Sequence, residues 1–247
     1  MKYALLLTML LGGSASATGL DDMRSALTAL QGQGSLRGAY EVKETKTDLE
    51  VKPAKGPETT IAAALLSEDA SALEIRWERA LLKRAAEESS PAKGAKRKDA
   101  LTQLIGQSSA PRMAQVLNYA PRLLQSLSIS QLKSERMDTY QGKPARLIEV
   151  VLTPQEVPND NVKIKDNTIV AQFWLGADGV PLAASTVHTI KAKFMVFMSY
   201  DKVTREELTF SVVANRLVVL KRESQGKEVG PAMDTEFHNL YTFTPKA

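Results

Sequence analysis

A series of strand-like segments, many of them alternating apolar and polar residues, is the feature that most limits the fold of this chain, and it runs from residue 129 almost to the end. A period of two places the apolar side chains on one face of a β-strand. The alternating segments are Ile129–Met137, Ala145–Leu152, Thr168–Leu175, Ala183–Tyr200, Leu208–Val212, Leu217–Arg222 and Phe237–Phe243. Because short turns separate them, consecutive strands pair antiparallel. The sequence therefore predicts a large antiparallel meander.

The strand expected from Ala183 to Tyr200 changes character along its length. Its first face stays apolar, whereas its second face begins with two lysines and turns apolar at Met195 and Phe197. A strand that becomes apolar on both faces needs a cover on the second one, and that cover is either a helix or a bound apolar ligand. Asp201-Lys202 then provides the expected turn.

The chain before residue 99 mixes helix and strand patterns. Asp21 or Asp22 can cap a short amphipathic helix that ends before Gly32. Residues 80–88 fit either a helix or a strand, and we expect a short helix. The strands expected in this part are Leu36–Val42, Thr59–Leu66 and Leu73–Trp77.

A helical insertion is expected around residues 99–127. Its apolar residues recur at spacings of three and four, which is the most regular helical stripe in the chain. The stripe consists of Met113, Val116, Leu117, Ala120, Leu123, Leu124 and Leu127. Pro121 lies inside it, lacks a backbone donor and clashes with the preceding turn. We therefore expect a kink, or two helices with Pro121 opening the second.

An apolar pocket is the one candidate binding site that the sequence offers. Methionine side chains are flexible and polarizable, so they suit adaptable pocket walls. We expect such a wall to combine the far end of the strand 183–200 with the helical stripe. The candidate residues are Phe194, Met195, Phe197, Met198, Met113 and Leu117.

Residues 1–17 have the layout of a secretory signal peptide. Lys2 precedes the apolar stretch Ala4–Leu11, and Ala15-Ser16-Ala17 presents small residues to signal peptidase, so cleavage is expected after Ala17. The apolar stretch is far shorter than the roughly 20 residues that span a bilayer. The chain has no cysteine, which excludes a lipoprotein anchor, disulfides and thiolate sites. We expect residues 18–247 to form one soluble β-rich periplasmic domain without an internal repeat.

No catalytic or metal-binding constellation stands out in the sequence. His188 and His238 are the only histidines, and neither has further ligands at a spacing typical of metal sites, although Glu236 shares a strand face with His238. No nucleophile elbow and no phosphate-binding glycine loop is present. The net charge of +4 is small for a nucleic-acid-binding protein. The densest basic cluster of the chain, Lys93–Lys98, is expected to be a solvated loop rather than a surface that binds a polyanion. We expect no enzyme, no cofactor, no metal and no nucleic-acid partner.

The order of the elements resembles the periplasmic lipoprotein-carrier (localization-factor) superfamily. The most similar part is Met23–Val42, a leucine-bearing helix followed by a glycine-rich break and a strand. Phe173–Leu182, with its Asp178-Gly179 turn, resembles a hairpin common in that family. The resemblance implies an α+β fold in which a strongly curved antiparallel sheet forms a half-barrel, helices pack on its concave face, and the cavity between them takes acyl chains. The long loops at Lys52–Glu58 and Glu87–Lys98 depart from the family pattern.

Three functions remain open from the sequence. The first is a periplasmic carrier or sensor that holds an apolar ligand, such as a lipid or a lipoprotein acyl chain, between the sheet and the helices. The second is a structural or partner-binding envelope protein whose core is filled by its own side chains and which exposes an apolar patch at a sheet edge. The third is a hydrolase whose catalytic groups meet only in the fold.

Overall fold

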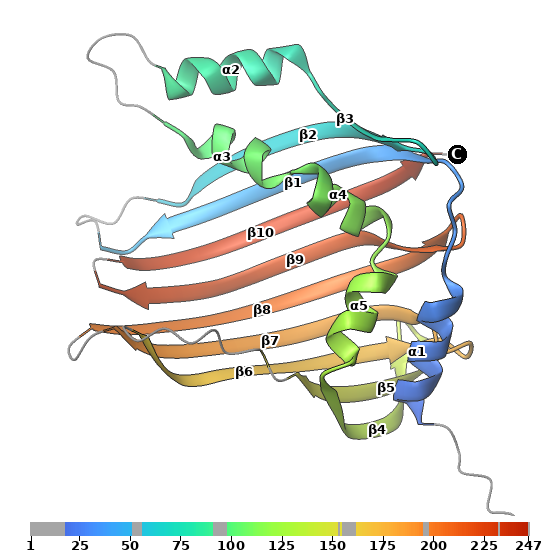
Figure 1. Cartoon of the computed structure of the whole chain (residues 1–247). Coiled ribbons are helices and arrows are strands. Elements are labelled where there is room, and N and C mark those ends of the chain that lie inside the picture. The colour runs from blue at the N-terminus through green and yellow to red at the C-terminus, as the bar shows by residue number, and fades with distance from the viewer. Residues whose placement is uncertain are drawn as a thin grey trace, which may run out of the picture.

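One large antiparallel sheet accompanied by helices makes up the described part of the chain (Figure 1). The computed structural model describes residues 18–50, 56–90, 98–152, 154, 162–194, 198–231 and 233–246, with the backbone alone for Val162 and Phe194. The strands are β1 (Leu36–Asp48), β2 (Glu58–Glu68), β3 (Leu73–Trp77), β4 (Ser130–Tyr140), β5 (Lys143–Leu152), β6 (Val162–Leu175), β7 (Pro181–Phe194), β8 (Met198–Val213), β9 (Arg216–Gly230) and β10 (Met233–Lys246). The strand order is β3-β2-β1-β10-β9-β8-β7-β6-β5-β4.

The meander predicted from residue 129 onward is confirmed as β4 to β10, in which each strand pairs with the next. The β4–β5 hairpin turns through Gln141 and Gly142, which both have positive φ. The last strand does not end the sheet, because β10 pairs along its length with β1. The sheet is therefore open, with β3 and β4 at its two edges (Figure 1).

The helices are α1 (Gly19–Ala29), α2 (Arg79–Ser89), α3 (Ala100–Gln107), α4 (Ala110–Leu117) and α5 (Ala120–Leu127). The short helix expected over residues 80–88 is confirmed as α2. The cap expected for the first helix is wrong by three or four residues, since Thr18 rather than an aspartate occupies the N-cap and accepts from the Asp21 amide. Asp21 and Asp22 lie in the first turn, where their negative charges favour the positive end of the helix dipole.

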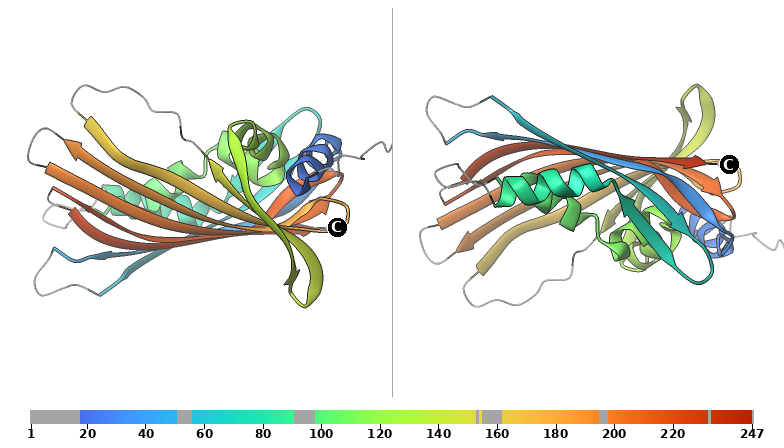
Figure 2. Two further views of the ribbon diagram at one scale, coloured as in Figure 1. Left: turned by 90° about the horizontal axis from the view of Figure 1, so that it is seen from below. Right: turned by 90° about the horizontal axis from the view of Figure 1, so that it is seen from above.

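The helices pack on one side of the sheet, and both views of Figure 2 show this layering. Their apolar residues form two core clusters. In the first, α1 and α5 pack on β5 to β9 around Leu27, Leu127 and Phe173. In the second, α3 and α4 pack on β1, β2 and β10 around Leu104 and Leu117. Partly buried Val116 contacts both clusters, so the stripe of the helical insertion joins them.

The helical stripe breaks where Pro121 predicted a break, and the result is two helices. α4 ends at Leu117, and Pro121 lies in the first turn of α5, where a missing N–H costs least. Between the helices, the Tyr119 amide donates to the Leu217 carbonyl on β9 at 2.8 Å. This hydrogen bond attaches the break directly to the sheet.

The turn expected at Asp201-Lys202 is wrong. Both residues lie inside β8, where Asp201 pairs with Val229 and Lys202 with Glu228. The chain has already reversed at that point, because Phe194 pairs with Met198. These polar residues fit mid-strand because the sheet neutralises them across strands, as the Lys202–Glu228 ion pair at 3.2 Å illustrates.

A buried arginine connects the start of β9 to the chain between α1 and β1. Arg216 donates from Nε to the Gly32 carbonyl at 2.8 Å and from Nη2 to the Gly34 carbonyl at 2.7 Å, and its Nη1 pairs with Glu68 at the end of β2. Gly32 also passes so close to the β8–β9 turn that a Cβ there would lie 1.9 Å from the Ala214 carbonyl oxygen. The arginine therefore satisfies carbonyls that no helix or strand partner reaches.

We predict that Arg216→Met lowers the free energy of unfolding by about 3 kcal/mol, because it leaves Glu68 and two carbonyls without their charged donor. Urea denaturation monitored by circular dichroism measures this. The matched control is Arg76→Met, which removes an ion pair whose side chains are 67% and 58% exposed and should cost less than about 0.5 kcal/mol. Equal losses in the two variants would contradict the structural role of Arg216.

Candidate functional site

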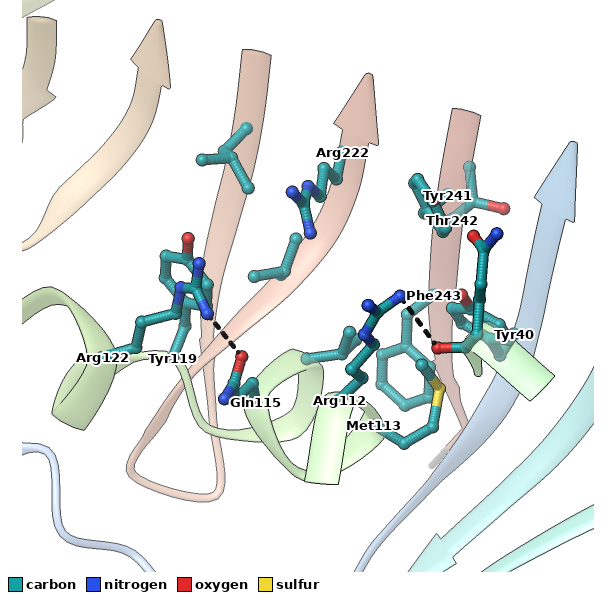
Figure 3. Close-up of a pocket in the computed structure, with 14 residues that line it drawn as sticks. Tyr40, Arg112, Met113, Gln115, Tyr119, Arg122, Arg222, Tyr241, Thr242 and Phe243 are labelled. Carbon is teal, nitrogen blue, oxygen red and sulfur yellow. Dashed lines mark hydrogen bonds between the residues drawn. The ribbon is translucent and has the colours of Figure 1, made fainter. Parts of the chain in front are cut away.

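Two adjoining cavities lie between the α4–α5 pair and the sheet. The first, of about 350 Å³, lies between α4 and strands β1, β8, β9 and β10 (Figure 3). The second, of about 320 Å³, lies between α5 and strands β5 to β9. Tyr119, Arg122, Leu208 and Arg222 line both cavities. We call the two together the helix-edge groove.

The second cavity has the more apolar wall. α5 contributes Leu123 and Leu127, and the helix-facing side of β5 to β8 contributes the rest of the apolar lining. The apolar residues from the sheet are Leu152, Ile169, Ala171, Phe173, Ala184 and Leu208. The polar part of the wall comes mainly from β7 to β9, with Thr186 and His188 on β7, Thr204 and Glu206 on β8 and Arg222 on β9, and α5 adds Arg122 and Ser126. A chain of methylenes can therefore contact the apolar side chains of α5 and of β5 to β8 along this cavity.

Three arginines line the first cavity, and no carboxylate does. Arg112 and Arg122 come from the first turns of α4 and α5, and Arg222 comes from the sheet, so the cavity has cationic groups on both of its layers (Figure 3). Arg112 and Arg122 are exposed. Solvent, and hence a ligand, can reach this part of the groove.

Aromatic rings and amides orient these arginines. The Arg122 guanidinium carbon lies 5.9 Å from the centre of the Tyr119 ring, and its Nη1 donates to Gln115 Oε1 at 2.8 Å. Arg222 lies 5.7 Å from the Tyr241 ring centre. Distances of this size are typical of cation–π contacts, which hold a guanidinium in place while leaving N–H groups available.

Glu206 is the one acidic residue among those lining the groove. Its Oε2 accepts from Arg222 Nε at 2.7 Å and lies 2.5 Å from Arg222 Nη2, so the two side chains neutralise each other. Neither Arg112 nor Arg122 forms an ion pair with a carboxylate of the described residues. The groove therefore retains a net positive charge.

The tyrosines of the groove stay neutral at ordinary pH. Burial raises the pKa of Tyr40, Tyr119 and Tyr241, and for Tyr119 the nearby Glu206 carboxylate raises it further. Their hydroxyls therefore remain protonated and do not offset the charge of the arginines.

The six residues that the sequence suggested for a pocket do not all meet. Met113 lines the first cavity, whereas Leu117 is fully buried beneath α4 and lines neither cavity. Met198 is half-buried near the far end of β8, away from both cavities. Met195 and Phe197 lie outside the described residues, and so does the side chain of Phe194.

The sequence-based prediction did not include the three arginines of the groove, although a repeated sequence motif marks two of them. α4 and α5 have almost the same sequence, APRMAQVL and APRLLQSL, so a short motif repeats after ten residues. The expectation of no internal repeat is therefore wrong at this scale. The repeat places Arg112 and Arg122 at the same position of successive helices. Arg222 carries no comparable signal, because polar residues surround it in β9.

The two histidines do not meet in one site. His188 lines the second cavity and bonds through Nε2 to Asn167 Oδ1 at 2.9 Å, as a hydrogen-bonded residue of an interior strand. His238 lies on the opposite face, and its Nε2 is 2.7 Å from Glu223 rather than paired with Glu236. Within the described ranges, no three metal-ligating side chains gather.

Comparisons with known proteins give one structural alignment. No protein-family model matches the sequence, and no curated protein matches it. A crystal structure of MucB in complex with MucA(peri) aligns over 91% of this chain and 94% of that chain, at 9% sequence identity and a TM-score of 0.22. This score is too low to establish a shared fold. None of the helices in the described ranges has the length and apolar character to cross a membrane.

We predict that His188 makes the protein less stable at acidic pH. Burial, and then the positive charge of Lys202, lowers the pKa of His188 below its ordinary value near 6.5. The folded state therefore binds this proton less well than the unfolded state does. The contribution of His188 to the free energy of unfolding is therefore fully present above about pH 6.5. It is lost as the pH falls through the lowered pKa.

Urea denaturation between pH 7 and pH 5 tests this prediction. His188→Gln keeps a side chain that can bond to Asn167, and we expect a smaller loss of stability on acidification than in the wild type. An equal or steeper loss in the variant, or an NMR titration of His188 above its ordinary pKa, would contradict it.

Proposed function

We propose that this chain is an exported, non-enzymatic binding protein that holds the apolar part of a small amphipathic ligand in the helix-edge groove. The supporting observation is the pair of adjoining cavities, whose shared wall leads from an apolar surface along α5 to a solvent-accessible polar surface along α4. Their sizes fall at the lower end of those typical of small-molecule sites. A lipid or an acyl chain is the ligand class that fits the apolar end.

Energetics favour a ligand in the existing cavities rather than one that displaces the helices from the sheet. Met113, Leu117, Leu123 and Leu127 are at most 5% exposed against the sheet. Burying four such side chains contributes roughly 6–12 kcal/mol as an upper estimate. A ligand of micromolar affinity contributes about 8 kcal/mol. Lifting α4 and α5 off the sheet would cancel most of that, so the groove along their edge is the better site.

A curved sheet, as in a half-barrel, is part of the proposal. No described helix covers the ends of β7 and β8 near Phe194 and Met198 (Figure 1). Even so, β8 residues on the helix-facing side are half-buried there, while those on the other side are exposed. The half-buried set is Met198, Tyr200, Lys202, Thr204 and Glu206. A concave face shields its side chains in this way, which supports a half-barrel.

A partner-binding envelope protein is the second candidate. Met137 on edge strand β4 is 72% exposed, and Ile61 and Leu65 on β2 are nearly half exposed on the face away from the helices. β3 pairs only with Ala64–Glu68 of β2, so the part of β2 around Ile61 has no strand neighbour on that side, although the Ile61 carbonyl accepts from Arg84 of α2 at 3.5 Å. Exposed apolar side chains at an open edge suit pairing with another chain.

Export through the signal peptide accords with the local structure after residue 17. Cleavage after Ala17 leaves Thr18 as the first residue, and Thr18 is also the N-cap of α1. The new amino group would lie at the positive end of this helix, where Asp21 and Asp22 compensate its charge. We propose the periplasm as the location of the mature protein.

We predict that Thr186→Trp abolishes uptake of a fluorescent fatty acid. Thr186 lines the second cavity, so an indole there occupies the space of the ligand. The matched control is Ser185→Trp, which places the same side chain on the opposite face of β7. Fluorescence titration of the mature protein, with native mass spectrometry for a co-purified lipid, provides the measurement.

Thermal melts of both variants show whether each one folds, and Thr204→Trp on β8 is a second blocking variant from the same cavity. Loss of uptake in the groove variants alone supports the proposal. No uptake by the wild type, or equal uptake by all folded variants, contradicts it. A stable protein captured from envelope extracts, without any lipid, would favour the second candidate.

A further inference from the structure

We propose that the ligand carries an anionic group, a carboxylate or a phosphate, and that Arg112 and Arg122 bind it at the α4 end of the helix-edge groove. This inference rests on the proposed function and adds the chemistry of the head group to it. The anion-binding arginines come from equivalent positions of the two repeated helices, and Arg222 faces them from the sheet (Figure 3).

Charge is the first reason. The lining of the first cavity has three arginines and no carboxylate. Arg222 is neutralised by Glu206, but Arg112 and Arg122 have no carboxylate partner among the described residues. Some exposed arginines elsewhere pair with a carboxylate, as Arg76 does with Glu74, whereas others, such as Arg37 and Arg205, form no ion pair with a described carboxylate. What distinguishes Arg112 and Arg122 is that both line the same cavity as a third arginine. Two cations left unpaired beside a third attract an anion, and they repel a cationic ligand.

Hydrogen-bonding capacity is the second reason. Arg112 donates to the Gln107 carbonyl at 3.2 Å, and Arg122 donates to Gln115 Oε1 at 2.8 Å and also hydrogen-bonds to the Tyr119 side chain. A guanidinium has several N–H donors in a planar fork, so most of them are available. This fork matches the oxygens of carboxylates and phosphates.

Preorganisation is the third reason. In both helices the arginine bonds back to the preceding helix, Arg112 to the last residue of α3 and Arg122 to Gln115 of α4. The Tyr119 ring supports the Arg122 guanidinium. An arginine that is already oriented loses less conformational entropy when it binds an anion.

The position of the arginines fixes the orientation of the ligand. Arg122 lines both cavities, Arg112 lines only the first, and the apolar wall of Leu123, Leu127 and Phe173 lies in the second. The tail therefore lies along α5 in the second cavity, and the head group lies in the first cavity, which both arginines line. A single small amphiphile satisfies both ends of the groove.

The test measures displacement of a fluorescent fatty acid from the mature protein by four amphiphiles with the same twelve-carbon chain: dodecanoate, dodecyl phosphate, dodecanol and dodecylamine. We expect dodecanoate and dodecyl phosphate to bind at least about tenfold more tightly than dodecanol, because charged hydrogen bonds are among the stronger ones, and dodecylamine to bind more weakly still. The ratio of dodecanoate to dodecyl phosphate identifies the preferred anion. Added salt should reduce the preference.

The variants separate a local site from general charge. Arg112→Gln together with Arg122→Gln should remove the preference for the anions while dodecanol still binds. The control pair, Arg37→Gln with Arg205→Gln, changes the net charge equally on the face away from the helices and should keep the preference.

Each remaining outcome has a definite meaning. If dodecanol binds as tightly as dodecanoate, the inference is wrong and the proposed function stands. If the preference survives in the Arg112/Arg122 variant, or is lost equally in the control pair, the arginines are not the site. If none of the amphiphiles displaces the probe, the proposed function fails, and this inference with it.

Discussion

The hydrogen bond from the Tyr119 amide to the Leu217 carbonyl determines the geometry on which the candidate site depends. A proline inside the helical stripe prevents one long helix, so the chain divides into two short ones. The Tyr119 amide at that division bonds to β9, the strand that also carries Arg222. The segment between α4 and α5 is therefore held at a fixed distance from the sheet, and the arginines of both helices face the same strand.

The groove exists because the helices cover only part of one face. Their apolar stripe is largely buried, with Val116 and Leu124 only partly so, and the two core clusters meet at Val116. The sheet, by contrast, is much longer than the helices that cover it, since β8 alone has 16 residues and α5 has 8. Side chains of the two core clusters fill much of the space between the helices and the sheet, and the two cavities are the space that remains there. The binding surface thus exists because the strands are longer than the helices that cover them, and not because the core is poorly packed.

The sequence predicted the sheet well because alternation is a local signal. Pairs such as β4 and β5, with a turn at Gly142, follow from period and turn chemistry alone. The reversal before Met198 was missed, because an apolar run without glycine, proline or asparagine resembles a continuous strand. The site was missed for a different reason. Arg222 meets Arg112 and Arg122 only through tertiary packing, and among the described residues expected for the pocket only Met113 lines the first cavity.

A crystal structure of the mature protein with dodecanoate tests the central claim most directly. We expect the alkyl chain between α5 and strands β6 to β8, and the carboxylate within hydrogen-bonding distance of Arg112 or Arg122, with the Tyr119–Leu217 hydrogen bond intact. A fatty acid found beneath displaced helices, or on the face of the sheet that carries His238, would contradict the account.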